Sequence, residues 1–292
     1  MHVLITGAGG FSGSHLVGAL LAEGHTVTAV CGRTKGRLDP SLYAGQPLTL
    51  VCGDLSGALA LPERIDAVVH AAARSPGPGI TAHTMVHDNA TASAQLVTYA
   101  RQAGATTFIY LSTLSVHGRI AGPVADETTP IVDPDAYGMS KYLGELVVRE
   151  QSQFRSLSVR LPGIIGKGAV RNWLSSCLAA ARANRTISLF NPDAPYNNAV
   201  HIANLSHLIT KVLSDTRWSG HDAVSLGAAG TTTTRHAVET LIDATSSTST
   251  VSIVPATRPP YSISSRRAHE LYGYAPMPIE AMLRKFASEN VT

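Results

Sequence analysis

The stretch Val3–Gly13, with the sequence VLITGAGGFSG, decides the fold of this chain. Three apolar residues lead into a turn in which Gly7, Gly10 and Gly13 stand three residues apart, and an amphipathic segment follows at 14–22. A strand that enters a helix through such a turn brings its backbone close to a pyrophosphate and aims free N–H groups at it. An ordinary strand-to-helix loop is the alternative, but the five strand-like runs that follow favour a dinucleotide site.

The rest of the first half predicts a parallel sheet covered by helices on both faces. Short runs that are apolar throughout alternate with longer amphipathic segments, as in doubly wound α/β proteins. Further strands are predicted at 27–30, 48–52, 67–70, 108–111 and 157–161, and helices at 14–22, 83–102 and 137–150. Later segments are expected as helices at 173–183, 203–213, 266–272 and 279–287, strands at 186–190 and 224–226, and a Ser/Thr-rich loop at 245–250. We expect a Rossmann-type domain over residues 1–165 and a smaller, discontinuous cap, mainly residues 166–292, with some segments returning to the sheet.

Composition and charge exclude several classes of protein. The chain has 292 residues, enough for one large or two modest domains, and its hydrophobic fraction of 44% excludes wholesale disorder. A net charge of +3 is too balanced for a protein that binds nucleic acid by neutralising phosphates. No apolar run is long enough to span a membrane, and the N-terminal residues lack the basic region and cleavage site of a signal peptide. We therefore expect a cytoplasmic protein.

The cysteines and histidines predict neither a disulfide framework nor a metal site. Cys31, Cys52 and Cys177 are odd in number and widely spaced, so reduced thiols are the better interpretation. The histidines form no HExxH pair, and no metal is expected.

A tyrosine and a lysine at helical spacing provide the candidate chemistry. Tyr137 and Lys141 stand four residues apart at the start of a predicted helix, so both project from the same face. A free phenol has a pKa of about 10, too high for a base at neutral pH, but a nearby ammonium favours the phenolate. Tyr137 could then exchange a proton with a substrate hydroxyl or carbonyl. A solvent-facing pair is the alternative; against it, the hydroxyl-rich segment 111–118 follows a strand at the edge where open α/β sheets bind ligands.

The ends of the second and third strands bear on the form of the dinucleotide. An acidic residue after the second strand would bind the adenosine ribose and repel a 2′-phosphate. This chain has no carboxylate there and offers Arg33, so NADP(H) is favoured and NAD(H) stays possible, unless the segment is simply a solvated basic loop. Asp54, after the third strand, could accept from the adenine amino group, or it is an ordinary turn residue.

The glycine turn, His70–Ala73, segment 111–118 and the Tyr137–Lys141 pair together resemble the extended short-chain dehydrogenase/reductase family, particularly its sugar-nucleotide epimerases and reductases. The resemblance covers essentially the whole chain. It implies an NAD(P)-dependent enzyme that transfers a hydride at a sugar carbon, C4 foremost, of a nucleotide-linked sugar bound by the cap. It makes Tyr137 the general acid/base, Lys141 the group that tunes its pKa, and Thr113 the catalytic hydroxyl.

The resemblance also implies which residues touch the ligands. The candidate cofactor contacts are Gly7, Gly10, Phe11, Ser12, Gly13, Arg33, Asp54, Leu55, Ala71, Ala72, Ala73, Asn89, Lys141 and Pro162. The candidate substrate contacts are Ser112, which adjoins Thr113, together with Asn197, Asn198 and Arg258. For Asn89 the alternative is a polar residue at a helix start, and for Arg258 a basic surface patch.

Departures from the family pattern limit the expected reaction and substrate. Leu114 and Ser115 stand where family dehydratases carry an Asp–Glu pair, so dehydration is disfavoured. Asn197 and Asn198 stand where many sugar-nucleotide enzymes carry an arginine, which leaves open a carbonyl reductase of a small ketone or aldehyde. A non-catalytic dinucleotide sensor would not need the Tyr–Lys pair. The helices expected at 83–102 and 137–150 match those through which the family forms homodimers, so we expect a homodimer.

Overall fold

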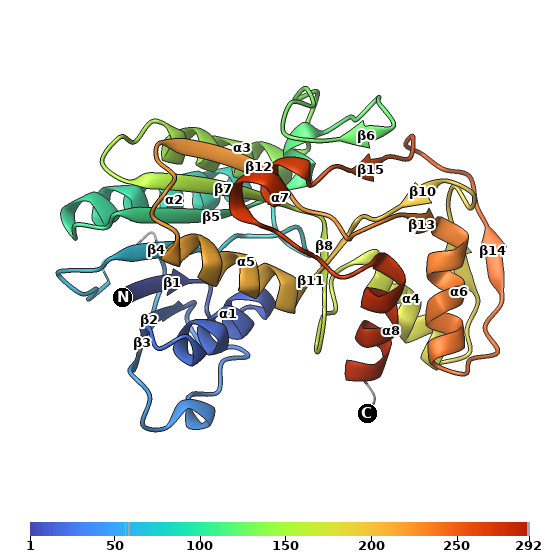
Figure 1. Ribbon diagram of the computed structural model, residues 1–292, viewed down its shortest axis with the longest axis horizontal. Coiled ribbons are helices and arrows are strands. Elements are labelled where there is room, and N and C mark those ends of the chain that lie inside the picture. The colour runs from blue at the N-terminus through green and yellow to red at the C-terminus, as the bar shows by residue number, and fades with distance from the viewer. Residues whose placement is uncertain (56, 58, 291–292) are drawn as a thin grey trace. The chain divides into compact units, whose positions relative to one another are not determined.

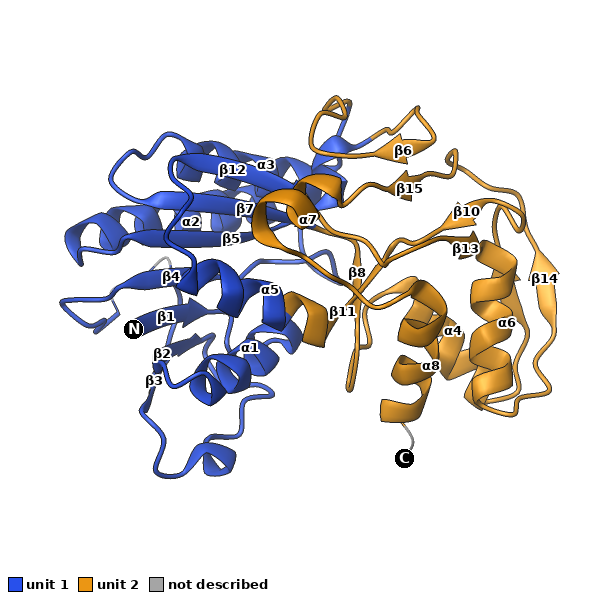
Figure 2. Cartoon of the chain, viewed as in Figure 1, with its two compact units in different colours: residues 1–118, 133–160, 206–224 blue, residues 119–132, 161–205, 225–292 orange. Residues whose placement is uncertain are grey.

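The computed structural model describes residues 1–292 apart from residues 56, 58, 291 and 292. The chain forms two compact units, coloured separately in Figure 2. Unit 1 comprises residues 1–118, 133–160 and 206–224, and unit 2 comprises residues 119–132, 161–205 and 225–292. Segment 119–132 thus belongs to unit 2 and segment 206–224 to unit 1, each on the opposite side of the border expected near residue 165. The functional division into cofactor and substrate parts stays a prediction.

Unit 1 is built on a seven-stranded sheet with the order β12-β7-β5-β4-β1-β2-β3 (Figure 1). Its strands are β1 (His2–Thr6), β2 (Thr26–Cys31), β3 (Leu48–Cys52), β4 (Ala67–His70), β5 (Thr107–Thr113), β7 (Arg155–Leu161) and β12 (His221–Ser225). β1 pairs in parallel with β2 and β4, β2 with β3, and β4 with β5. The predicted doubly wound α/β fold is confirmed, and β12, which overlaps the short strand expected at 224–226, is its seventh strand.

The sheet of unit 1 grows outward from β1 in two directions, which places helices on both faces. α1 (Phe11–Ala22) links β1 to β2, whereas α2 (Ala82–Gln102) links β4 to β5 and α3 (Ala136–Arg149) precedes β7. Because such crossovers are right-handed, α2 and α3 lie together on one face and α1 lies on the other (Figure 1). All of β4 is buried, as a sheet covered on both sides requires. The reversal of strand order at β1 creates the crevice where open α/β sheets bind ligands.

In the part of unit 2 that the structure describes, short strand pairs are combined with four helices. Its parallel pairs are β6 (Val124–Ala125) with β15 (Ser262–Ile263), β8 (Gly163–Ile165) with β11 (Ala199–His201), and β9 (Ile187–Leu189) with β14 (Val251–Ile253); β10 (Pro195–Tyr196) and β13 (Thr232–Thr233) are antiparallel. Its helices are α4 (Trp173–Arg182), α6 (Thr234–Ala244), α7 (Arg266–Tyr272) and α8 (Ile279–Glu289), and α6 packs against α4 and α8. α5 (Ile202–Ser214) begins in unit 2 and ends in unit 1.

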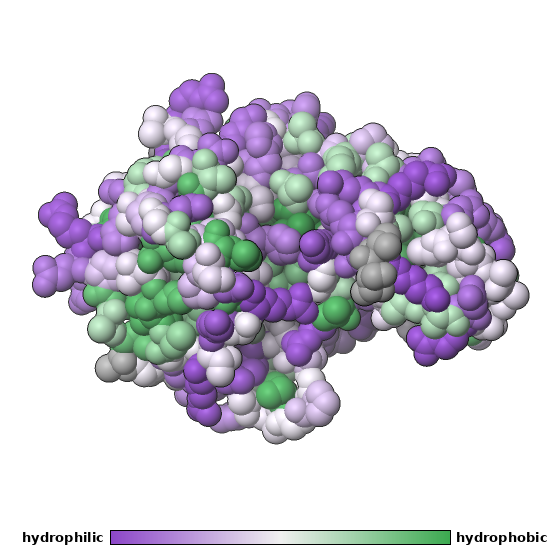
Figure 3. Space-filling view, turned by 90° about the horizontal axis from the view of Figure 1, so that it is seen from below, coloured by the Kyte–Doolittle hydropathy of each residue, from purple (hydrophilic) through white to green (hydrophobic). Residues whose placement is uncertain are grey.

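The surface and composition of the described residues add two observations. No helix among them combines the length and apolar character needed to cross a membrane. Their His, Cys, Asp and Glu side chains form no group of three that could hold a metal ion. The face in Figure 3 mixes hydrophilic and hydrophobic side chains, and the hydrophobic ones gather toward the left, over unit 1.

Candidate active site

The glycine turn after β1 is shaped by close approaches between backbone segments. Gly7 has a φ of 69°, and a Cβ there would lie 2.6 Å from the Ala72 nitrogen and 2.7 Å from the Ala71 carbonyl carbon. A Cβ on Gly13, in the first turn of α1, would lie 2.1 Å from the Gly7 oxygen. Gly10 closes the turn by donating its N–H to that oxygen at 2.9 Å. The resulting surface is bare backbone at a helix N-terminus, which fits the pyrophosphate of a dinucleotide.

The basic loop after β2 packs beside this turn. A Cβ on Gly36 would lie 2.3 Å from the Gly9 oxygen, which also accepts the Arg37 N–H at 2.9 Å. The Arg37 guanidinium lies 5.9 Å from the centre of the ring of Phe11, the residue that precedes Ser12 in the chain. Arg33 is exposed at the end of β2. The loop therefore presents a cation next to the candidate phosphate surface.

The residues after β3 separate into an exposed and a partly buried one. Asp54 is exposed, whereas Leu55 is half-buried and packs against the core cluster of unit 1. Leu55 also lines a cavity of about 500 Å³ together with Tyr99 and Ala103, which lie at the C-terminal end of α2. Leu55 thus faces the hydrophobic core of unit 1, and Asp54 is the more accessible of the two.

The end of β4 is held by buried polar groups. His70 lies 2.7 Å from the Thr6 hydroxyl through Nδ1 and 3.2 Å from the Ser93 hydroxyl through Nε2. Burial, and then the charge of Lys141, lower the pKa of His70 well below its usual value, so this imidazole is neutral at physiological pH. Ala71 and Ala72, half-buried after it, border the glycine turn, and Ala73 is exposed.

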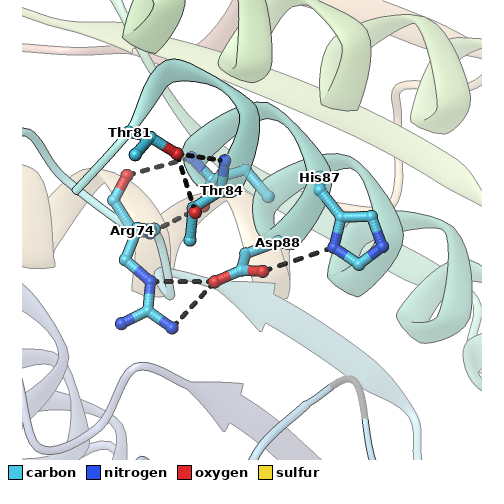
Figure 4. Close-up of polar contacts among 6 residues, drawn as sticks. Arg74, Thr81, Thr84, His87 and Asp88 are labelled. Atoms are coloured by element: carbon cyan, nitrogen blue, oxygen red, sulfur yellow. Dashed lines mark hydrogen bonds and ion pairs between the residues drawn. The ribbon is translucent and has the colours of Figure 1, made fainter.

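Asn89 connects the loop after β4 to two helices. Its Oδ1 accepts the Arg74 N–H at 2.6 Å, and its Nδ2 donates to the Arg74 carbonyl at 3.0 Å and to the Ser140 hydroxyl at 2.9 Å. Both amide hydrogens are engaged within the protein, which gives Asn89 a structural role in the loop. Figure 4 shows the outer side of the same loop, where Arg74 pairs with Asp88 at 2.8 Å.

The start of α3 is placed against the end of β5. Asp135 caps the helix by accepting the Gly138 N–H at 2.7 Å. A Cβ on Gly138 would lie 2.1 Å from the Ser115 carbonyl oxygen, so the helix approaches the 3-10 helix Leu114–His117 without an intervening side chain. Thr113 caps that 3-10 helix by accepting the Ser115 N–H at 3.2 Å. This contact brings the element that carries Tyr137 alongside the hydroxyl of Thr113.

Tyr137 and Lys141 lie in a partly desolvated environment. Burial raises the pKa of the Tyr137 phenol, and a hydrogen bond with the Ser75 side chain opposes the rise. Lys141 is fully buried, with its Nζ 4.0 Å from the centre of the Tyr110 ring. Burial lowers the pKa of Lys141 to about 7, and the negative charge of Glu145 opposes this decrease. Near neutral pH, Lys141 therefore exchanges its proton with little free-energy cost.

Ser112 and Thr113 point in opposite directions, as adjacent strand residues do. Ser112 is buried, and its hydroxyl donates to Glu145 Oε1 at 2.5 Å. Thr113 is only half-buried and stands at the strand end. The hydroxyl at the edge of the sheet is therefore that of Thr113.

In unit 2 the candidate substrate residues differ in exposure. Asn197 is buried: its Nδ2 donates to the Ile263 carbonyl at 2.8 Å, and its Oδ1 accepts the Ile263 N–H at 2.8 Å. The buried Oδ1 of Asn198 accepts no hydrogen bond from the described residues, and Arg258 is exposed. Pro162, half-buried, directly follows β7. The amide of Asn197 thus connects segments of the unit, whereas a ligand role for Asn198 and Arg258 stays a prediction.

Comparison with known proteins assigns the family. The model of the "NAD dependent epimerase/dehydratase family" matches residues 3–227. The chain belongs to this family. It is 26% identical over 263 residues to a UDP-glucose 4-epimerase of Erwinia amylovora, covering 78% of each chain, and 25% identical over 236 residues to one of Neisseria meningitidis serogroup A, covering 71% and 70%. The resemblance inferred from the motifs is thereby confirmed.

Solved structures of epimerases share the fold of this epimerase/dehydratase family member. The UDP-Glc/GlcNAc 4-epimerase of Campylobacter jejuni matches with a TM-score of 0.84 at 20% identity, covering 99% of this chain and 98% of that one. The UDP-glucuronic acid 4-epimerase of Bacillus cereus, in complex with NAD, matches with a TM-score of 0.86 at 20% identity and the same coverage.

The structure adds two groups that the sequence did not single out as parts of the family site. Ser75 lowers the pKa of Tyr137 through its side chain, yet it lies in an irregular loop and belongs to no motif. Glu145 accepts a hydrogen bond from the Ser112 hydroxyl and lies one helical turn after Lys141. The continued four-residue spacing from Tyr137 to Lys141 to Glu145 is the signal that could have identified it.

Proposed function

We propose that this protein is a nucleotide-sugar 4-epimerase that works with a bound nicotinamide dinucleotide. The observation that supports the proposal is the approach of α3, which carries Tyr137 and Lys141, to the 3-10 helix that follows Thr113 at the end of β5. Membership of the epimerase/dehydratase family supports the reaction class, and the UDP-glucose 4-epimerases among its relatives support a UDP-sugar as substrate.

The chain's own residues supply binding and proton transfer. Thr113 and Tyr137 would hydrogen-bond the oxygen at the reacting carbon, and Tyr137 would accept and return its proton. Since burial raises the pKa of the phenol, Tyr137 needs a neighbouring positive charge to reach the phenolate. Lys141 would provide that charge from one turn away. Bound dinucleotide would supply the hydride acceptor and donor of the reaction.

The dinucleotide would lie along the glycine turn and the strand ends beside it. Gly7, Gly10 and Gly13 would let the pyrophosphate approach the backbone closely, and the N–H groups at the start of α1 would face it. Ala71 and Ala72 would leave room beside the turn, because larger side chains there would project into the same space.

We propose that the protein binds NAD and that it also accepts NADP. NAD-bound structures among the fold's neighbours support the first part. The absence of a carboxylate after β2, where Arg33 stands, supports the second, since only an acidic residue there would repel a 2′-phosphate. Chromatography of the nucleotide released from denatured, freshly purified protein tests this directly. Stoichiometric NAD agrees with a cofactor retained through turnover, whereas an empty protein that binds NADPH more tightly than NADH would instead indicate a reductase.

The activity is tested by incubating the purified protein with UDP-glucose or UDP-galactose and following conversion of each into the other. Tyr137→Phe keeps the ring but removes the exchangeable proton, and should lower kcat by about 10²–10⁴-fold. Tyr142→Phe, the same change on the same helix, serves as the matched control and should retain activity. If wild-type protein loaded with NAD converts neither UDP-sugar nor any other nucleotide sugar, the proposal is wrong.

We also propose a homodimer that associates through α2 and α3, as the family resemblance implies. These helices pack side by side on one face of unit 1. Light scattering at micromolar concentration should give twice the chain mass of 30.6 kDa. A cytoplasmic location stays a prediction from the sequence.

A further inference from the structure

A buried charged cluster lies behind the candidate catalytic pair. Glu145 is 4% exposed and Arg160, from β7, is 7% exposed. Arg160 Nη2 donates to Glu145 Oε2 at 2.7 Å, and its Nε donates to Oε1 at 3.1 Å. The Ser112 hydroxyl donates to Oε1 at 2.5 Å. Both carboxylate oxygens are therefore held by donors from two neighbouring strands of the sheet.

The position of this cluster matters more than its contribution to stability. A buried ion pair rarely stabilises a fold more than apolar residues of similar volume would. This one joins β7 to the two elements that carry the candidate catalytic groups, β5 and α3. Ser112 directly precedes Thr113 on β5, and Glu145 lies one turn beyond Lys141 on α3. The cluster thus fixes the helix with the Tyr–Lys pair onto the strand with the hydroxyl.

Lys141 is surrounded mainly by neutral groups. The titratable groups around it are His70 from β4, Tyr110 from β5, and Tyr137 and Glu145 from α3. Glu145 in turn pairs with Arg160 from β7, whose Nη1 lies 3.4 Å from His117 Nε2. Helix α2 contributes the uncharged Ser93 and Asn89. Glu145 is the acidic group whose charge favours the ammonium form of Lys141.

We propose that Glu145 is a positioning residue of the active site. Its carboxylate, clamped by Arg160 and Ser112 one helical turn from Lys141, is the counter-charge that favours the ammonium form of Lys141. The role given to Lys141 rests on the proposed function, but the coupling of the two charges does not depend on the substrate.

The protonation of Lys141 can be measured without substrate or cofactor. Protein labelled with carbon-13 at lysine Cε contains five lysines, and the Lys141 signal is the one that disappears in Lys141→Met. Glu145→Gln removes the counter-charge and should lower the pKa of Lys141 by about one unit or more. Arg160→Gln removes the cation that neutralises Glu145 and should raise the pKa of Lys141. Glu150→Gln, an exposed position at the end of α3, is the matched control and should leave it unchanged.

The opposite signs separate charge coupling from simple loosening. If the cluster only held the fold together, both variants would admit water and move the pKa of Lys141 upward, toward its ordinary value. An upward shift in both variants, or no shift in either, would overturn the proposal. Should Glu145→Gln fail to fold, the upward shift in Arg160→Gln, together with none in Ser112→Ala, decides it. Absence of epimerase activity with the two opposite shifts intact would contradict the proposed function and leave this inference standing.

Discussion

Replacing Gly13 with alanine tests whether the turn after β1 depends on close backbone approach. A Cβ on Gly13 would lie 2.1 Å from the Gly7 oxygen and 2.8 Å from the Ala8 Cα. These are backbone atoms of the turn itself, and no side-chain rotation can move them away. The turn must therefore open, and it is the surface to which we assign the pyrophosphate.

The magnitude follows from two opposing effects. Alanine is favoured over glycine in a helix interior by about 1 kcal/mol, whereas overpacking of a rigid site costs about 1–3 kcal/mol. Gly18→Ala is the matched control in the same helix, because its Cβ would meet the far end of the Tyr43 side chain, with the hydroxyl oxygen at 2.9 Å, and no backbone atom among its nearest neighbours. Since helix propensity cancels between the variants, Gly13→Ala should be less stable than Gly18→Ala by about 2 kcal/mol, or roughly 4–8 °C in Tm.

Thermal unfolding of both variants, with and without NAD, is the appropriate assay. Gly18→Ala should keep the increase in Tm that NAD produces in the wild-type protein, and Gly13→Ala should lose most of it. Equal melting temperatures for the two variants, with equal stabilisation by NAD, would refute the assignment of the turn.

Three other predictions concern charge and thiol reactivity. The pKa of Lys141 is about 7 in the folded protein and about 10.4 in the unfolded chain, so the unfolded chain binds more protons between these two pH values. The free energy of unfolding should therefore rise from pH 7 to pH 9. Lys141→Met should remove most of that rise, as measured by urea titrations. Arg33→Glu should weaken NADPH binding relative to NADH about tenfold or more, as measured by calorimetry, because a carboxylate repels the 2′-phosphate. Exposed Cys52 should react first with a disulfide reagent at pH 8, whereas burial raises the pKa of Cys31 to about 11 and of Cys177 to about 12, so these two should react only after unfolding.

The order of elements in unit 1 was predictable because its signals are local. Apolar runs, the glycine turn and the spacing from Tyr137 to Lys141 each occupy a short stretch of chain. Helix α6 was missed because it begins in a run of threonines, and its buried face, with Ala237, Val238 and Leu241, emerges only against α4 and α8.

The roles of single polar residues were less predictable because they depend on distant partners. Asn197 was a reasonable substrate contact by position, but its amide bonds to a residue 66 positions away. The preference for Thr113 over Ser112 follows from strand alternation, which the sequence contains, whereas the acceptor for Ser112 lies 33 positions away on α3. From the sequence, Glu145 and Arg160 would each be predicted as an exposed charged residue, because their pairing is visible only in the folded chain.

The division into two units constrains how this chain is made. The chain passes between them at five points, after residues 118, 132, 160, 205 and 224. Neither unit is therefore a continuous fragment that one cut could release, and a chimera that exchanged unit 2 would need all five junctions. During synthesis the sheet of unit 1 stays incomplete until β12 has left the ribosome, when nearly half of unit 2 has already emerged. The two units must consequently mature together.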